Sequence, residues 1–142
     1  TFLEEKLIEE LKNYEEKVVF IKGKIEPEQK MEEIDNVTFY NFMQTEELEK
    51  TFNESNFVLC RSGYTTVMDL AKLEKKAFFI PTPGQFEQEF LAKKYKREGI
   101  LPMAKQDDFR IADLDAIWLY QGLPKFNSIV DWKKLFLLFE SE

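Results

Sequence analysis

Two short segments of this 142-residue chain carry residues that could bind a ligand. The first covers residues 60–69 and reads Cys-Arg-Ser-Gly-Tyr-Thr-Thr-Val-Met-Asp, the pattern of a strand, a glycine turn and a helix start. Backbone N–H groups at a helix N-terminus attract anions, and the Thr65 and Thr66 hydroxyls could donate to the same phosphate. Asp69 lies one turn further on and could accept a hydrogen bond from a ribose hydroxyl. The segment therefore favours a phosphate-containing ligand.

A structural reading of this segment stays open. Ser62 or Thr65 would then cap the helix, Gly63 would only form the turn, and Asp69 would be solvated. Cys60 is expected to be buried filler within a strand and not a reactive thiol.

The second segment covers residues 81–90 and reads Pro-Thr-Pro-Gly-Gln-Phe-Glu-Gln-Glu-Phe. A proline-rich loop cannot continue a central strand, so a helix is expected to start after it. Gln85, Gln88 and Glu89 on its first turns could hydrogen-bond a polyhydroxylated ligand such as a sugar. An ordinary polar helix start is the alternative.

The composition excludes several kinds of chemistry. The chain has no His and one Cys, which removes imidazole bases, disulfide frameworks and Cys/His zinc sites. Twenty Lys and Arg against 27 Asp and Glu leave a net charge of −7, the wrong sign for binding nucleic acid. The Asp residues at 107, 108, 113 and 115 lack a metal-ligand spacing, so neither a metal nor a cofactor is predicted.

Apolar patterns predict the elements that position these segments. Four short apolar runs are expected to be strands, at residues 18–21, 37–42, 57–60 and 77–80. Helical spacing predicts helices at 3–15, 46–52 after a Thr45 cap, 67–73, and 86–95, the last anchored by Phe86 and Phe90 and ended by Gly99. Residues 111–142 are expected to form a tail of two helices, whose apolar residues Trp132, Leu135, Phe136, Leu138 and Phe139 belong to the core or to a docking surface.

The alternation of strands and helices predicts an α/β fold, with an open, mostly parallel sheet and helices on both faces. One domain over residues 1–142 is expected from the length. Ligands of such sheets bind beyond the carboxyl ends of the strands, which directs attention to the residues after 42, 60 and 80.

The two segments, in this order and separation, resemble the C-terminal, nucleotide-sugar-binding half of the GT-B glycosyltransferases of family 28, whose type member is MurG. The resemblance rests on residues 57–63, Thr66, Asp69, Ala71, the strand end at Ile80 and Pro81, and the pair Gln88 and Glu89. It implies a Rossmann-like fold that lacks the first strand of the family.

The resemblance also implies roles for single residues. Gly63, Tyr64, Thr65 and Thr66, with Ser62, would face the diphosphate and sugar, and Asp69 would hold the ribose, where MurG has Glu. Gln88 would contact the donor sugar, with Glu89 and Gln85 nearby. Phe42 or Met43 would lie against the nucleobase. The donor implied is a UDP-sugar, most simply a UDP-N-acetylhexosamine.

The expected partner of the chain is its own N-terminal acceptor domain, which in this family carries the catalytic base. The chain starts without Met and inside a helical pattern, so we interpret it as a fragment that binds donor but transfers nothing alone. The implied reaction moves a hexosyl unit, with inversion and without a metal, to a lipid-linked or glycan acceptor in cell-envelope synthesis. A cytoplasmic location is expected from the lone thiol and from the absence of a signal sequence. Peripheral membrane association through the acceptor domain and a homodimer remain open.

Three other functions remain open at this stage. The chain could be a noncatalytic nucleotide-sugar-binding subunit of a split glycosyltransferase, or a nucleotide-sugar hydrolase or epimerase of the same fold. It could also be an α/β interaction domain without a ligand.

Overall fold

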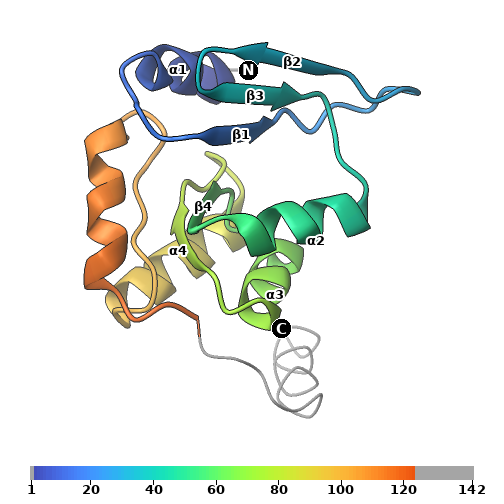
Figure 1. Ribbon diagram of the computed structural model, residues 1–142. Coiled ribbons are helices and arrows are strands. Elements are labelled where there is room, and N and C mark those ends of the chain that lie inside the picture. The colour runs from blue at the N-terminus through green and yellow to red at the C-terminus, as the bar shows by residue number, and fades with distance from the viewer. Residues whose placement is uncertain (1, 124–142) are drawn as a thin grey trace.

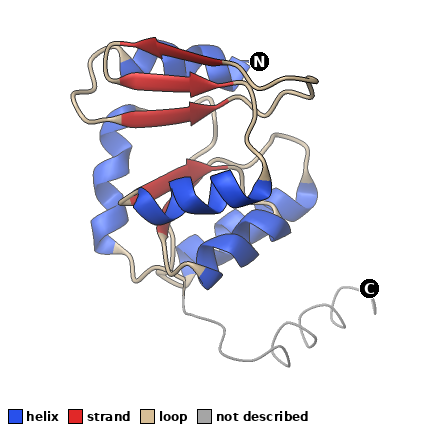
Figure 2. Ribbon diagram, turned by 45° about the vertical axis from the view of Figure 1, so that its right-hand side comes forward, coloured by secondary structure: helices blue, strands red, loops and turns tan. Residues whose placement is uncertain are grey.

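The computed structural model describes residues 2–123 of the chain, which Figure 1 shows coloured along the sequence. Short strands alternate with helices, and helices flank the strands on more than one side (Figure 2). The elements are α1 (Phe2–Leu11), β1 (Val18–Ile21), β2 (Met31–Ile34), β3 (Val37–Tyr40), α2 (Thr45–Glu54), β4 (Phe57–Cys60), α3 (Tyr64–Lys72), β5 (Lys76–Phe79), α4 (Phe86–Arg97) and the 3₁₀ helix η1 (Ile111–Leu119). The predicted α/β class is confirmed.

The strands form two small sheets where one open sheet was expected. β1, β3 and β2 make one sheet, with β3 in the middle, and β4 pairs with β5 in the other. The pairs β1–β3 and β4–β5 are parallel. No other strand of residues 2–123 bonds to the remaining edges of β1 and β4, so the two sheets stay separate (Figure 2). Between them, α2 carries the chain from the end of β3 to the start of β4 (Figure 1).

The sequence pattern missed β2, whose residues lie between the predicted strands at 18–21 and 37–42. All four residues of Met-Glu-Glu-Ile are exposed, so no apolar alternation marks the strand. β2 is an edge strand that pairs antiparallel with β3 through a two-residue turn at Asp35 and Asn36. Asp35 adopts φ 54°, as the first residue of such tight hairpins does. Backbone pairing alone therefore forms this strand.

The helix ends agree with the prediction in one case and differ in another. α2 begins at Thr45 with Gln44 as N-cap and without a side-chain cap bond, so the predicted Thr45 cap is wrong by one residue. α4 ends as predicted at Gly99, which adopts φ 73°. The Ile100 N–H donates to the Tyr95 carbonyl at 2.9 Å, which is the closing bond of a Schellman motif.

The predicted anchoring of α4 by Phe86 and Phe90 is wrong. These side chains are 80% and 44% exposed and stack on one another, with ring centroids 6.4 Å apart. The helix instead buries Leu91, Ala92 and Tyr95 against β4, β5 and α3. The buried stripe of α4 therefore lies on the face of Leu91, Ala92 and Tyr95, and Phe86 lies outside it.

The start of the predicted tail belongs to the core. η1 is a 3₁₀ helix, and its Leu114 and Ile117 pack with Phe109 and Phe78 under β4 and β5. An Asp113 carboxylate oxygen accepts the Arg110 N–H at 2.9 Å, so Asp113 caps η1. The second predicted helix, with its apolar residues from 132 to 139, lies outside the described residues.

Helix α1 holds the two sheets together. Leu3 and Leu7 pack against the buried cluster around Phe78 and Phe109, as do Phe57 and Leu59 of β4. Ile8 and Leu11, on the next turns, pack with Val37 and Phe39 of β3 and with β1. One amphipathic stripe thus contacts both sheets, which orients the carboxyl ends of β3 and β4 relative to one another.

Candidate functional site

The helix α3 starts without a side-chain cap. Gly63 is the N-cap residue, and its carbonyl accepts the first helical bond from the Val67 N–H at 3.0 Å. Because glycine has no side chain, the N–H groups of the first turn point outward beside the exposed Thr65 and the half-buried Thr66. The structural reading in which Ser62 or Thr65 caps the helix is wrong. This turn presents donors and a positive dipole end to a ligand.

Ser62, in the same turn, has a structural role. Its side chain is fully buried, and its hydroxyl donates to the Gln88 backbone carbonyl at 2.7 Å. The bond ties the β4–α3 turn to the first turn of α4. The Ser62 side chain therefore has no surface to offer a ligand, and it holds the two segments that contain the other predicted contacts.

The loop before α4 is a type II turn. The Gln85 N–H donates to the Thr82 carbonyl at 3.1 Å, with Pro83 and Gly84 between them and Gly84 at φ 83°. The Gln88 side-chain carbonyl accepts the Thr82 N–H at 2.8 Å. This bond orients the side chain and leaves its NH₂ group, with two donors, for a ligand.

The other predicted sugar contacts flank Gln88. Glu89 is half-buried, and its carboxylate accepts the Gly84 N–H at 3.4 Å, a long bond that leaves most of its acceptor capacity available. Gln85 is exposed at the N-cap of α4, without a side-chain cap bond. The structure thus groups Gln85, Gln88 and Glu89 around the turn that Ser62 ties to α3. Tyr64 packs partly buried on the core beneath α3.

Arg61 has a structural role that the sequence analysis did not predict. Its guanidinium donates to the Ile80 and Pro81 carbonyls at 3.1 and 3.0 Å and to the Gln106 side-chain oxygen at 3.1 Å. These bonds join the carboxyl ends of β4 and β5 to the loop after α4. Burial lowers the pKa of Arg61, although the group stays charged at neutral pH. The sequence held one signal for this role. Arg61 directly follows β4, where backbone carbonyls lose their sheet partners and a cation can donate to them.

Asp69 lies half-buried on α3, close to α2. Burial raises the pKa of its carboxyl, the negative charge of Glu49 raises it further, and Lys72 opposes the shift. Lys72 itself pairs with Glu49, with its Nζ 3.6 Å from the carboxylate oxygen. Asp69 is therefore a weaker acid than an ordinary aspartate and loses its charge at a higher pH.

Met43 belongs to a separate loop, which follows β3. Its sulfur accepts a hydrogen bond from the Thr51 hydroxyl of α2 at 3.4 Å. The neighbouring Phe42 is half-buried, and its N–H donates to the Asn41 side-chain oxygen at 3.0 Å. The structure thus gathers the residues of the loops after β4 and β5 at one junction, whereas Met43 lies along α2.

The remaining candidates for chemistry are inactive or absent. Burial raises the pKa of the Cys60 thiol to about 12, which keeps it protonated and unreactive at neutral pH. Within residues 2–123 no three acidic or thiol side chains come close enough to hold a metal ion. Among the same residues no helix is long and apolar enough to cross a membrane.

Comparison with known proteins identifies the family of the chain. Residues 1–118 match the model of the glycosyltransferase family 28 C-terminal domain. The match covers both turn segments and every helix and strand except the last residue of η1. Neither curated proteins nor solved structures give a significant match.

Proposed function

Because this chain belongs to the family 28 glycosyltransferases as their C-terminal, donor-binding domain, we propose that its donor is a UDP-N-acetylhexosamine. The companion N-terminal domain that the family implies would hold the acceptor, a lipid-linked sugar or glycan, and the catalytic base. On this proposal the chain alone binds the donor and transfers nothing. The observation that carries the proposal is the uncapped N-terminus of α3 after Gly63, next to the oriented amide of Gln88.

The geometry supports a donor site in which the loops after β4 and β5 bind different parts of the donor. The first-turn N–H groups and hydroxyls of Thr65 and Thr66 suit the diphosphate. As the sugar C1 bond to the diphosphate breaks, negative charge grows on the leaving oxygen, and oriented N–H dipoles stabilise that charge without reorganising. The Gln88 NH₂ and the Glu89 carboxylate offer donors and acceptors for sugar hydroxyls, and Asp69 offers an acceptor to the ribose.

A calorimetric titration of the chain with UDP-N-acetylglucosamine tests the proposal. We expect Asp69→Ala and Gln88→Ala each to weaken binding about tenfold, the loss expected for one or two ligand hydrogen bonds. Asp115→Ala, an exposed aspartate of η1, is the matched control and should bind as the wild type does. Unchanged affinity in both site variants would contradict the assignment.

Thermal unfolding independently tests whether the chain binds UDP. At 100 times its Kd, a ligand that binds only the folded state adds about 2.7 kcal/mol of stability. UDP should therefore protect the chain from unfolding. An interaction domain without a ligand would show no protection at any UDP concentration.

A further inference from the structure

The outward side of α4 carries four exposed side chains in one line. At 3.6 residues per turn, Phe86, Phe90, Lys93 and Arg97 follow one another along the helix, opposite its buried residues. Phe86 is 80% exposed and Phe90 is 44% exposed. This line, here called the α4 ridge, is therefore aromatic where the helix begins and basic where it ends.

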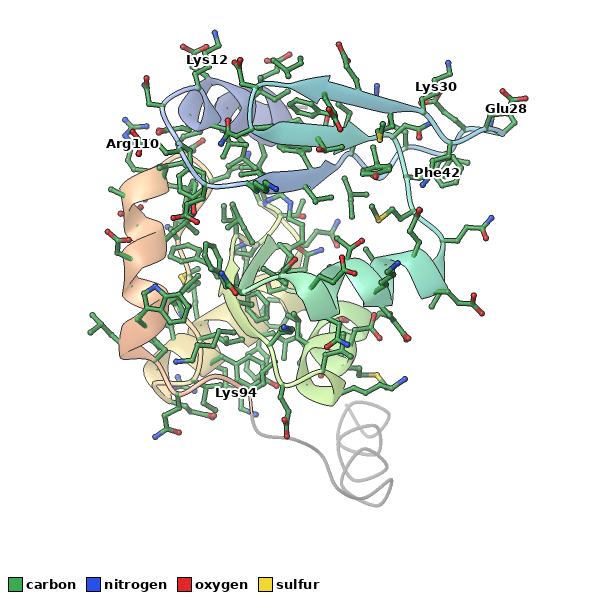
Figure 3. The ribbon with its side chains drawn as sticks, in the orientation of Figure 1. Lys12, Glu28, Lys30, Phe42, Lys94 and Arg110 are labelled. Atoms are coloured by element: carbon green, nitrogen blue, oxygen red, sulfur yellow. The ribbon has the colours of Figure 1, made fainter. Side chains whose placement is uncertain are left out.

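Each flank of the ridge carries an acid followed by a base. Glu87 and Lys94 lie on one flank, and Glu89 and Lys96 lie on the other. None of these four side chains forms an ion pair with another part of residues 2–123. Figure 3 shows Lys94 at the opposite end of the molecule from Lys12, away from the sheet of β1, β3 and β2. The first half of α4 is thus acidic on its flanks and the second half is basic.

The ridge residues are arranged symmetrically about the middle of the helix. Phe86 and Arg97 are the first and last residues of α4, and Phe90 and Lys93 are equally far from its midpoint. A two-fold axis through this midpoint sets a second α4 antiparallel to the first. Phe86 then faces Arg97 of the second copy, and Phe90 faces its Lys93. Lys and Arg pack on aromatic rings through their apolar stems and through cation–π attraction.

The same axis brings opposite charges together on both flanks. Glu87 faces Lys94 of the second copy, and Glu89 faces its Lys96. A parallel second helix would instead set ring on ring, acid on acid and base on base. Because like charges in contact disfavour a complex, charge complementarity selects the orientation of a partner. The α4 surface is therefore complementary to itself in the antiparallel orientation.

We propose that α4 is the interface of a symmetric dimer, in which two copies of this chain pack their α4 ridges antiparallel. The inference goes beyond the proposed donor function and does not depend on it. One helix of 12 residues is a small contact, so we expect a weak dimer whose fraction rises with protein concentration. An anionic lipid surface also suits exposed rings beside cations, but the net charge of −7 and the acids on both flanks disfavour it.

Sedimentation velocity of the full chain over a series of protein concentrations measures the dimer. Phe86→Ser removes one ring from each copy and should weaken the dimer about tenfold or more. Leu119→Ser is the matched control, because Leu119 is 86% exposed on η1, and it should dimerise as the wild type does. A chain that stays monomeric at every concentration overturns the inference. A dimer that Phe86→Ser leaves unchanged overturns it as well.

A charge swap on the flank that lies outside the proposed donor contacts tests the antiparallel orientation. Glu87→Lys sets two cations against one another, and Lys94→Glu sets two acids against one another. Each clash occurs twice in the symmetric dimer, so each variant should weaken it about three- to tenfold. The double variant restores opposite charges and should dimerise nearly as the wild type does.

Glu87 and Lys94 are two turns apart on α4, beyond the reach of a pair within one helix. Only a contact between two copies therefore accounts for the recovery. A double variant that dimerises no better than the single variants overturns the antiparallel α4 interface.

Discussion

The loops after β3 and after β4 each bury one polar side chain, Asn41 and Ser62, and only Ser62 was predicted to contact the ligand. Ser62 belongs to the loop that was predicted to bind the ligand, yet its hydroxyl joins two segments of the protein. Asn41 was assigned no role, and its side-chain oxygen accepts the N–H groups of Lys30 and of the adjacent Phe42. The comparison shows that a residue type suited to ligand binding can be used entirely by the fold. The ligand would then contact the neighbouring residues that this side chain holds in place.

If the loop after β4 has a structural role, Arg61 should matter most for stability, because it makes three hydrogen bonds to other segments. Arg61→Ala removes three hydrogen bonds and leaves the buried Ile80 and Pro81 carbonyls without their donor. We expect the free energy of unfolding to fall by about 2–4 kcal/mol. Urea denaturation measures this change.

The control for this prediction is Arg110→Ala. Arg110 makes an exposed ion pair with Glu10 at 3.4 Å, an interaction worth about 0–1 kcal/mol. Equal losses in the two variants would show that Arg61 is no more than a surface cation.

The second prediction concerns Ser62 itself. Ser62→Ala should lower the free energy of unfolding by about 1–3 kcal/mol, because the Gln88 carbonyl loses a buried donor. Ser55→Ala, which removes a less buried hydroxyl from the Thr51 carbonyl, should have a smaller effect. A Ser62→Ala variant that keeps full stability but loses donor affinity would reverse the role assigned here and restore direct ligand contact.

The third and smallest expected effect is a pH shift at Asp69. Its raised pKa means that the folded chain holds this proton more tightly than the unfolded chain, so the charge disfavours folding as pH rises through that pKa. The proposed ribose contact needs the ionised form, so donor affinity should fall by up to about tenfold as pH falls, the loss expected for Asp69→Ala. The loss should begin at a pH where an ordinary aspartate, with pKa 3.8, is still charged.

UDP-N-acetylglucosamine titrations across pH measure this shift, because its diphosphate has no ionisation near neutrality. Glu49→Gln removes a charge that raises the Asp69 pKa, so it should move the loss of binding to lower pH. Asp69→Asn should abolish the dependence. A pH profile that neither variant changes would remove Asp69 from the ribose site.

The sequence predicted the fold class because strands and helices have distinct apolar periods, and Val37, Phe39, Phe78 and Ile80 are buried as those patterns require. β2 was not predicted because an edge strand of exposed residues carries no such apolar pattern. The exposure of Phe86 was also not predicted, because the apolar residues of α4 allow more than one buried stripe and the structure buries Leu91, Ala92 and Tyr95.

Within the site, the turns at Gly63 and Gly84 could be predicted because glycine is common where a strand ends in a turn, and Gly84 adopts the positive φ of 83° that a type II turn requires. The structural roles of Arg61 and Ser62 could not, because their bonds reach residues up to 45 positions away along the chain. Such partners are set by tertiary packing and leave no local spacing in the sequence.

The central claim, that the α3 N-terminus binds the donor diphosphate, is tested most directly by UDP titration of Gly63→Asp and Gly63→Asn. Gly63 has φ −77°, and a Cβ there would have no atom within 4 Å, so both side chains fit. Either side chain can cap the helix and hold its stability at or above that of wild type. Only the aspartate places a negative charge where the diphosphate would lie. The account predicts that Gly63→Asp, while folded, binds UDP more than tenfold more weakly than Gly63→Asn, about 1.4 kcal/mol or more. Equal UDP affinity in the two variants would contradict it.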